Sequence, residues 1–211
     1  MKLIALALLA SLHAAAIIVD RIAISAGTQA IVDSEIDRRI RLTAFENGVP
    51  PIFDTGARKA AADRLIDQKL VEHEMEVGRY PRSGAEQWGG LLLDYSKQNF
   101  KSDPKALEAA LAAASLTRED LEQDLARQSD LVTFISLRFR PAVQVTDQDV
   151  REYFQKNIQP KLPPGTGSIE DYRIRIEAII TSSRADTEVE AWLKDQRKKT
   201  KIQYLEKELA P

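Results

Sequence analysis

The residues best able to do chemistry in this chain are two histidines and many carboxylates. There is no cysteine, and the histidines are His13 and His73, so thiol nucleophiles and thiolate metal sites are excluded. His73 stands between Glu72 and Glu74 in a segment with helical periodicity. A metal site built on this one imidazole would need further ligands, and no second histidine is near. We interpret His73 as a residue on a helix surface or at the edge of the core.

No arrangement typical of a hydrolase or a nucleotide-binding enzyme is present in the sequence. No serine lies in a Gly-x-Ser-x-Gly turn, and a Ser-His-Asp triad would have to use His73. The Gly165–Gly167 stretch lacks the lysine and the preceding strand of a phosphate-binding loop. The acidic residues stand near Lys and Arg at spacings typical of helix ion pairs, with a paired-carboxylate hydrolase as the open alternative. These patterns predict no catalytic residue, no metal site and no cofactor.

Charge and hydropathy argue against two classes of partner. Lys and Arg number 30 against 32 Asp and Glu, for a formal net charge of -2, so no general positive field attracts nucleic acid. A basic run at 194–201 ends a predicted helix, where cations suit the helix dipole; anionic-lipid or nucleic-acid binding is the alternative. No apolar stretch reaches the roughly 20 residues of a membrane span. We expect no integral membrane segment.

The first 16 residues predict a cleavable secretion signal. Lys2 precedes an apolar run at 3–12, and small residues follow at Ala14 and Ala16. This is the order of a charged region, an apolar region and an Ala-x-Ala cleavage site. A membrane anchor or a buried helix is the alternative, but the run is too short for a span. We expect cleavage after Ala16 and a secreted protein.

Hydrophobic periodicity predicts a mainly α fold with a small sheet. Residues 17–24 and 30–32 are rich in Ile, Val and Ala, with Gly27 between them, which predicts a β-hairpin. The predicted helices cover about 34–47, 57–80, 84–100, 104–114, 118–139, 147–157 and 168–199. Their expected caps are Asp33 or Ser34, then Thr117, Thr146 and Ser168. One expected apolar stripe is Ala62, Leu65, Ile66 and Leu70, with His73 or Val77, and the expected buried stripe of the 118–139 helix is Leu121, Leu125, Val132 and Ile135. The apolar positions of the last helix are Ile176, Ile179, Ile180, Val189, Trp192 and Leu193.

Several segments occur in a characteristic order. After the hairpin come "IVDSEID" (31–37), "ADRLIDQKLVEHEMEVG" (62–78), "LTREDLEQDLARQ" (116–128) and "VQVTDQDVREYFQKN" (143–157), and "VEAWLKDQRKKTKIQYL" (189–205) ends the series. This order resembles the N-terminal chaperone module of SurA-type periplasmic foldases, which is shared with PrsA and trigger-factor-like chaperones. Each motif alone is only a capped amphipathic helix, so the resemblance rests on order and spacing.

The resemblance implies an organisation of the chain. After the signal at 1–16, a helical module covers 17–158, a linker covers 159–168, and a C-terminal helix and strand at 169–211 pack back on the module. In this family a strand from the chain's end joins the N-terminal strands. "IQYL" at 202–205 is therefore expected to pair with the hairpin, which would be marginal alone. A simple extension of the last helix is the alternative.

The resemblance also implies a function, with one departure. Family members commonly carry a parvulin prolyl-isomerase domain, but the segment between Asn157 and Trp192 is too short for one. We therefore expect a non-enzymatic, ATP-independent periplasmic chaperone that binds unfolded or partly folded secreted and outer-membrane proteins. The alternatives are an assembly factor that binds one specific folded envelope partner, and a degenerate isomerase homologue.

The predicted client-binding surface is an apolar stripe on the 84–100 helix. Trp88, Leu91, Leu92 and Tyr95 share a helical face, and Phe100 follows nearby. Two adjacent glycines weaken this helix by about 1 kcal/mol each relative to alanine. Aromatic side chains are common anchors at interfaces, whereas burial in the core is the usual fate of such a stripe.

Overall fold

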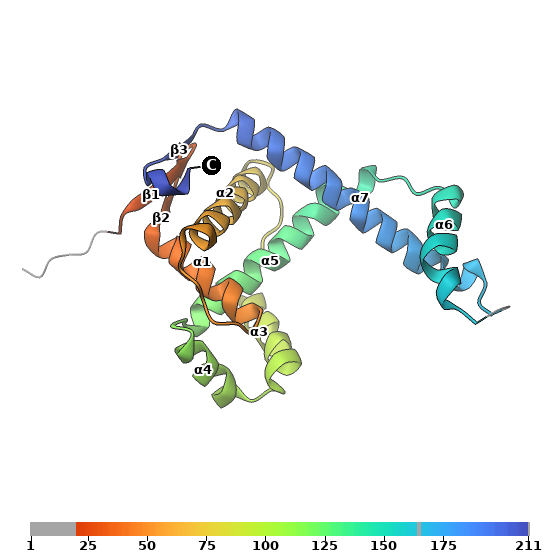
Figure 1. The fold of residues 1–211 in the computed structure, drawn as a ribbon, viewed down its shortest axis with the longest axis horizontal. Helices are drawn as coiled ribbons and strands as arrows, with labels where there is room; N and C mark the ends of the chain where they lie inside the picture. Colours follow the sequence, from red (N-terminus) through yellow and green to blue (C-terminus); the bar gives the residue numbers. More distant parts are fainter. Residues whose placement is uncertain (1–19, 164–165, 211) are drawn as a thin grey trace, which may run out of the picture.

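The computed structural model describes residues 20–163 and 166–210. It is mainly helical with a small three-stranded antiparallel sheet, which confirms the predicted fold class (Figure 1). The strands are β1 (Ile22–Ala26), β2 (Gln29–Val32) and β3 (Ile202–Tyr204); the helices are α1 (Asp33–Glu46), α2 (Thr55–Val77), α3 (Ala85–Phe100), α4 (Pro104–Ala113), α5 (Arg118–Arg138), α6 (Asp147–Tyr153) and α7 (Ile169–Lys199). The predicted secretion signal lies outside the described residues.

The sheet joins the two ends of the described chain. Strand β1 lies in the middle, with β2 on one side and β3 on the other. Gly27 forms the hairpin turn at a φ of 61°, a left-handed conformation that suits glycine. Ile24 is paired with Tyr204, and Ala26 with Ile202, so the predicted pairing of the C-terminal strand with the hairpin is confirmed.

Burial and charge both hold this C-terminal strand in place. Leu209, in the turn after β3, is buried in the same core as Ile24 and the buried face of α2. Arg58 of α2 donates to Glu206 at 3.1 Å and also to Asp33 and Asp37. The chain's end is therefore bound to the sheet, to α2 and to the start of α1.

The helix caps follow the prediction with one exception. Thr117, Thr146 and Ser168 begin α5, α6 and α7, each in a capping box. Helix α1, however, has Val32 as its N-cap, and Glu35 accepts a hydrogen bond from the Val32 amide. The prediction of a cap at Asp33 or Ser34 was wrong because β2 leads into α1 without an intervening residue.

Burial confirms part of each predicted stripe. Ala62, Leu65, Ile66, Leu70, Leu121, Ile176 and Val189 are buried. The expectations for the end of α2 and for Val132 were wrong: His73, Val77 and Val132 are exposed. Val71 and Met75 fill the core at the end of α2, and Phe134 does so on α5, because these helix faces turn toward α7. In α7, Ile179 lies on the exposed side.

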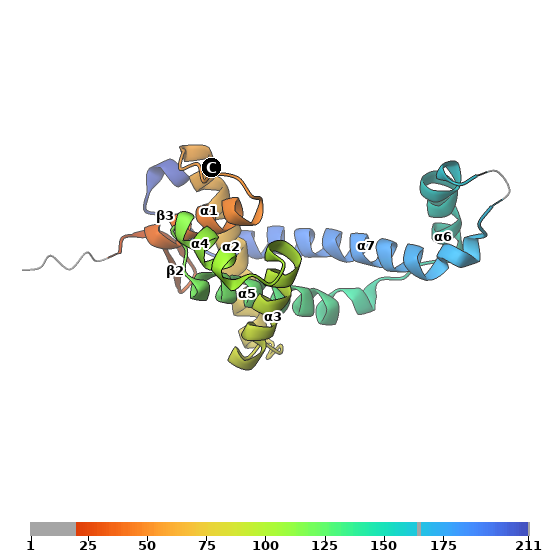
Figure 2. The ribbon, with the colours of Figure 1, turned by 90° about the horizontal axis from the view of Figure 1, so that it is seen from below.

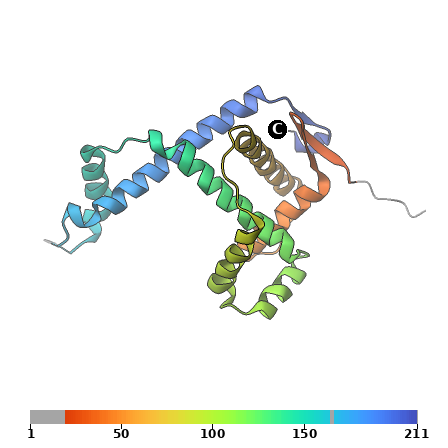
Figure 3. The same ribbon diagram turned by 180° about the vertical axis from the view of Figure 1, so that it is seen from behind.

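Helix α7 gives the molecule its extended shape. Its first half packs on α6 through a separate cluster around Ile176, Val150 and Phe154. Its second half lies against α5 and α2 and leads back to the sheet. Figure 2 shows α6 at the far end of α7, away from the sheet. From behind, α5 runs between α7 and the α3–α4 pair (Figure 3).

None of the described helices is both long and apolar enough to cross a bilayer.

We expect Leu209→Ala to lower the free energy of unfolding by about 2 to 4 kcal/mol, because it leaves a cavity in the core beneath the sheet. Leu205, four residues earlier, is 60% exposed, so Leu205→Ala is a matched control with an expected change under about 0.5 kcal/mol. Urea unfolding of both variants measures the difference. Equal stabilities would mean that the returning segment contributes nothing to the core.

Candidate functional site

The predicted client stripe on α3 faces mostly inward. Leu92 is 2% exposed and lies in a core cluster with residues of α1, α4 and α5. Tyr95 and Phe100 pack against that cluster, and both rings stack on Phe45 of α1 at centroid distances of 6.4 and 6.2 Å. These three side chains hold α3 to α1. They are core residues, which was the alternative to a client-binding surface.

The other two residues of the stripe are partly accessible. Leu91 is half-buried, and Trp88 donates its indole N–H to the Ser83 carbonyl oxygen at 3.2 Å. The most exposed apolar residue of α3 is Leu93, at 68%. The structure thus does not gather the five predicted residues into an open hydrophobic surface.

His73 does not take part in a cluster with other ligand-type side chains. Its side chain is exposed on α2. Within residues 20–163 and 166–210, no group of three or more His, Cys, Asp or Glu side chains is placed to hold a metal ion.

A cavity of about 350 Å³ lies between α2, α5 and α7, away from the α3 stripe. Its apolar wall combines one face of each helix. The apolar lining residues are Val71 and Met75 of α2, Leu131 and Ile135 of α5, and Val189 and Leu193 of α7. The spacing of four residues within each pair puts both side chains on the same helix face, so three regular helices are sufficient to build the wall.

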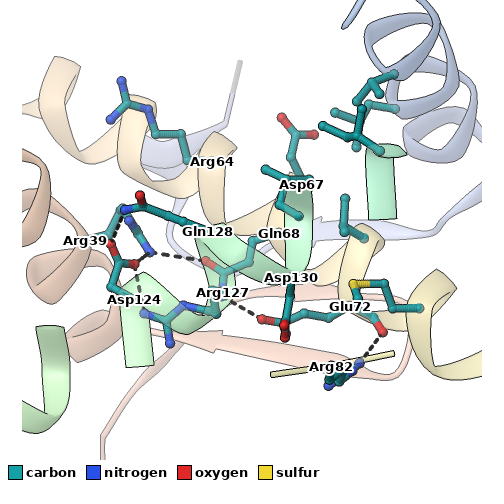
Figure 4. A pocket seen from close by; sticks show the side chains of 16 residues that line it. Arg39, Arg64, Asp67, Gln68, Glu72, Arg82, Asp124, Arg127, Gln128 and Asp130 are labelled. Carbon is teal, nitrogen blue, oxygen red and sulfur yellow. Dashed lines mark hydrogen bonds and ion pairs between the residues drawn. The ribbon is translucent and has the colours of Figure 1, made fainter. Parts of the chain in front are cut away.

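Charged and amide side chains complete the cavity at two ends (Figure 4). At one end Arg39, Arg127 and Gln128 gather around the carboxylate of Asp124. At the other end lie Glu72, Asp130 and Arg82. The cavity is therefore amphipathic, with an apolar middle.

Asp124 is the centre of the first polar end. It is 1% exposed, and its Oδ1 accepts from Arg39 at 2.5 Å and from Arg127 at 3.0 Å. Its Oδ2 accepts from Gln128 at 3.0 Å, and the same amide nitrogen donates to Glu46. Since a buried carboxylate is costly without partners, this network explains how a charge is accommodated on the inner face of α5.

The two carboxylates of this network have opposite pKa shifts. Burial alone would raise the pKa of Asp124, but the guanidinium groups of Arg39 and Arg127 hold it below its ordinary value. Partial desolvation raises the pKa of Glu46, and the neighbouring Asp124 carboxylate raises it further. Asp124 is therefore the ionised partner of the arginines, and Glu46 takes up a proton more readily than an ordinary glutamate.

One residue of the sequence could have indicated this site, because it is a charged residue at a position where the hydrophobic pattern expects an apolar one. Asp124 stands three residues after buried Leu121, at a position where a stripe of period 3.6 expects an apolar side chain. A charged residue there indicates a buried partner of opposite sign. Identifying Arg39 as that partner requires the packing of α1 on α5, which the sequence pattern does not provide.

Comparison with known proteins gives no family for this chain. No protein-family model matches it, and no curated protein matches it significantly.

We expect Asp124→Asn to lower the free energy of unfolding by about 3 kcal/mol at neutral pH, because two partly buried guanidinium groups lose their carboxylate. Asp94→Asn is a suitable control, since Asp94 is exposed on α3. Chemical denaturation of both variants measures the loss. A change as small as the control's would show that the ion pairs contribute nothing net.

The lowered pKa of Asp124 also predicts acid sensitivity. A carboxyl group whose pKa is lower in the folded state than its ordinary value of 3.8 stabilises the folded protein at pH values above 3.8. This stabilisation is lost as the pH falls through the folded-state pKa. The wild type should therefore lose more stability than Asp124→Asn between about pH 4 and pH 2. Denaturation curves across this range test it, and parallel losses in both proteins would contradict it.

Proposed function

We propose that this protein is an ATP-independent chaperone that binds unfolded or partly folded polypeptides in the cavity between α2, α5 and α7. The observation that carries the proposal is the cavity's composition: a wall of six apolar side chains from three helices, open to solvent beside Leu131, which is 38% exposed. An unfolded client differs from a folded one by exposing apolar side chains, and such a wall can bury them.

The order of elements supports the same proposal. The chain resembles the SurA-type chaperone module, and the pairing of β3 with β1 is the closure which that resemblance implies. The proposed clients are secreted or outer-membrane proteins, and the proposed location is the periplasm, after removal of residues 1–16. The proposed binding site is the cavity rather than the α3 stripe, because Leu92, Tyr95 and Phe100 are engaged in the core.

The cavity does not contain groups arranged for catalysis by the chain itself. Its four carboxylates each accept a hydrogen bond: Asp124 and Asp67 from arginines, Asp130 from a backbone amide, and Glu72 from the Gln68 side-chain amide. We propose that the protein is not an enzyme and that binding alone is its activity.

We expect Leu131→Glu to weaken binding of an unfolded client by roughly five- to thirtyfold, since it removes about 1 to 2 kcal/mol of apolar contact at the cavity's rim. Val132 is the next residue of α5 and is 59% exposed, but it does not line the cavity. Val132→Glu is therefore the matched control, with the same charge on the same helix. Suppression of aggregation of a chemically unfolded outer-membrane protein provides the measurement.

The two variants separate the possible outcomes. Loss of activity in Leu131→Glu alone supports the cavity as the client site. Equal loss in both variants would point to a general effect of the charge on α5, and full activity in Leu131→Glu would contradict the site. A pull-down that recovers one folded partner in equimolar amount, with no suppression of aggregation, would favour an assembly factor instead.

A proline-isomerisation assay tests the proposal that the protein is not an enzyme. We expect no acceleration of cis–trans exchange in a proline-containing tetrapeptide, because the segment between Asn157 and Trp192 is too short for a parvulin domain. A clear increase in rate would overturn this expectation and favour the isomerase homologue.

A further inference from the structure

We propose that the cavity is selective for apolar client segments that carry a carboxylate, and that this carboxylate binds at the end formed by Arg39, Arg64 and Arg127. The inference rests on the proposed function and specifies the class of segment bound. It follows from an excess of donors and of positive charge at that end, in contact with the apolar wall.

The excess of donors is seen in how Asp124 is shared. Arg39 and Arg127 both donate to the same oxygen, Oδ1 of Asp124. Each guanidinium group has five N–H donors, so one carboxylate oxygen and the Gln68 side-chain oxygen use only a part of them. The Nε of Arg127 is buried and has no acceptor among the described residues. A further acceptor at this end would satisfy donors that the protein itself leaves unused.

Arg64 adds a positive charge that no carboxylate balances. Its guanidinium group donates to the Thr43 hydroxyl oxygen at 3.0 Å. No carboxylate of the described residues lies within ion-pair distance of it. The nearest acidic residue in sequence on the cavity side of α2, Asp67, is bound by Arg197 at 2.6 Å. Arg64 is exposed at the cavity's edge, where it can turn toward a bound anion.

The charge at this end remains positive when both carboxylates are counted. Arg39, Arg64 and Arg127 line the cavity, Asp124 accepts hydrogen bonds from two of them, and Glu46, outside the lining, is bound by Gln128. Guanidinium groups bind carboxylates in bidentate geometry and with charge-assisted hydrogen bonds. A carboxylate is therefore a better complement here than a neutral amide or a cation.

The opposite end of the cavity has the reverse balance. Glu72 accepts from the Gln68 amide at 2.7 Å, and Asp130 accepts from the Ser83 backbone N–H at 2.6 Å. Arg82 is the cation there, and it donates to the Glu72 backbone oxygen. Two carboxylates beside one arginine disfavour a client carboxylate at this end, so the two ends together give the bound segment a direction.

The client's carboxylate has two possible sources, a chain terminus or an acidic side chain. The same chemistry serves both, and synthetic peptides distinguish them. The first pair is a dye-labelled peptide of alternating leucine and serine that ends either in a free carboxylate or in an amide. The second pair is amide-ended and carries one internal glutamate or one internal glutamine.

Fluorescence anisotropy with these four peptides tests the inference. We expect at least one acidic peptide to bind about fivefold or more tightly than its neutral twin, a ratio that falls in about 0.5 M salt because the charges are screened. Arg64→Gln should bring that ratio close to one. Arg175→Gln is the matched control, since Arg175 is exposed on α7 outside the cavity, and it should preserve the ratio.

The outcomes separate this inference from the proposed function. Equal binding of acidic and neutral peptides, with both weakened by Leu131→Glu, would leave the chaperone site intact and overturn the carboxylate selectivity. A preference that survives Arg64→Gln, or that Arg175→Gln also removes, would equally overturn it. Failure of all four peptides to bind would overturn both.

Discussion

The pairing of β3 with β1 constrains how the rest of the chain can run. Helix α7 leaves α6 at the far end of the molecule and must deliver Ile202 beside Ala26. Its second half therefore crosses α2 and α5, where Val189 and Leu193 become the third side of the cavity. Leu193 packs against both the core beneath the sheet and the cluster around Phe134. Closure of the sheet and formation of the cavity are thus consequences of one helix path.

The Asp124 network is a second constraint, and it ties α1 to α5. A buried ion pair often adds little net stability over an apolar pair, because desolvation offsets its Coulomb attraction. Here the network has a further consequence, since it positions guanidinium donors of Arg39 and Arg127 at the end of an apolar wall. Two leucines could hold α1 against α5 equally well, but the cavity would then lose the arginine end at which we propose that a client carboxylate binds.

Local sequence signals were sufficient for most of the fold. Capping boxes at Thr117, Thr146 and Ser168 marked three helix starts, and the "RKKT" end of α7 separated helix from strand. The errors arose where burial depends on which elements meet. Val132 is apolar and suits a stripe, but Phe134 turns toward α7 in its place. The α3 stripe looked like a binding surface because the sequence does not reveal that Phe45 stacks on Tyr95 and Phe100. The cavity could not be predicted from the sequence, because its wall comes from three helices in distant parts of the chain.

The size of the cavity bears on how a chaperone of this kind could release its clients. About 350 Å³ is near the lower end of the roughly 300 to 1,000 Å³ typical of ligand pockets, so it accommodates a few side chains and not a folded surface. Burying a few apolar side chains gives only modest affinity, because the entropy lost when a flexible segment becomes ordered offsets part of the gain. On the proposed function, weak binding of this kind would release the client as soon as folding buries the same side chains, without a nucleotide to drive the exchange. The energy for release would come from the client's own folding.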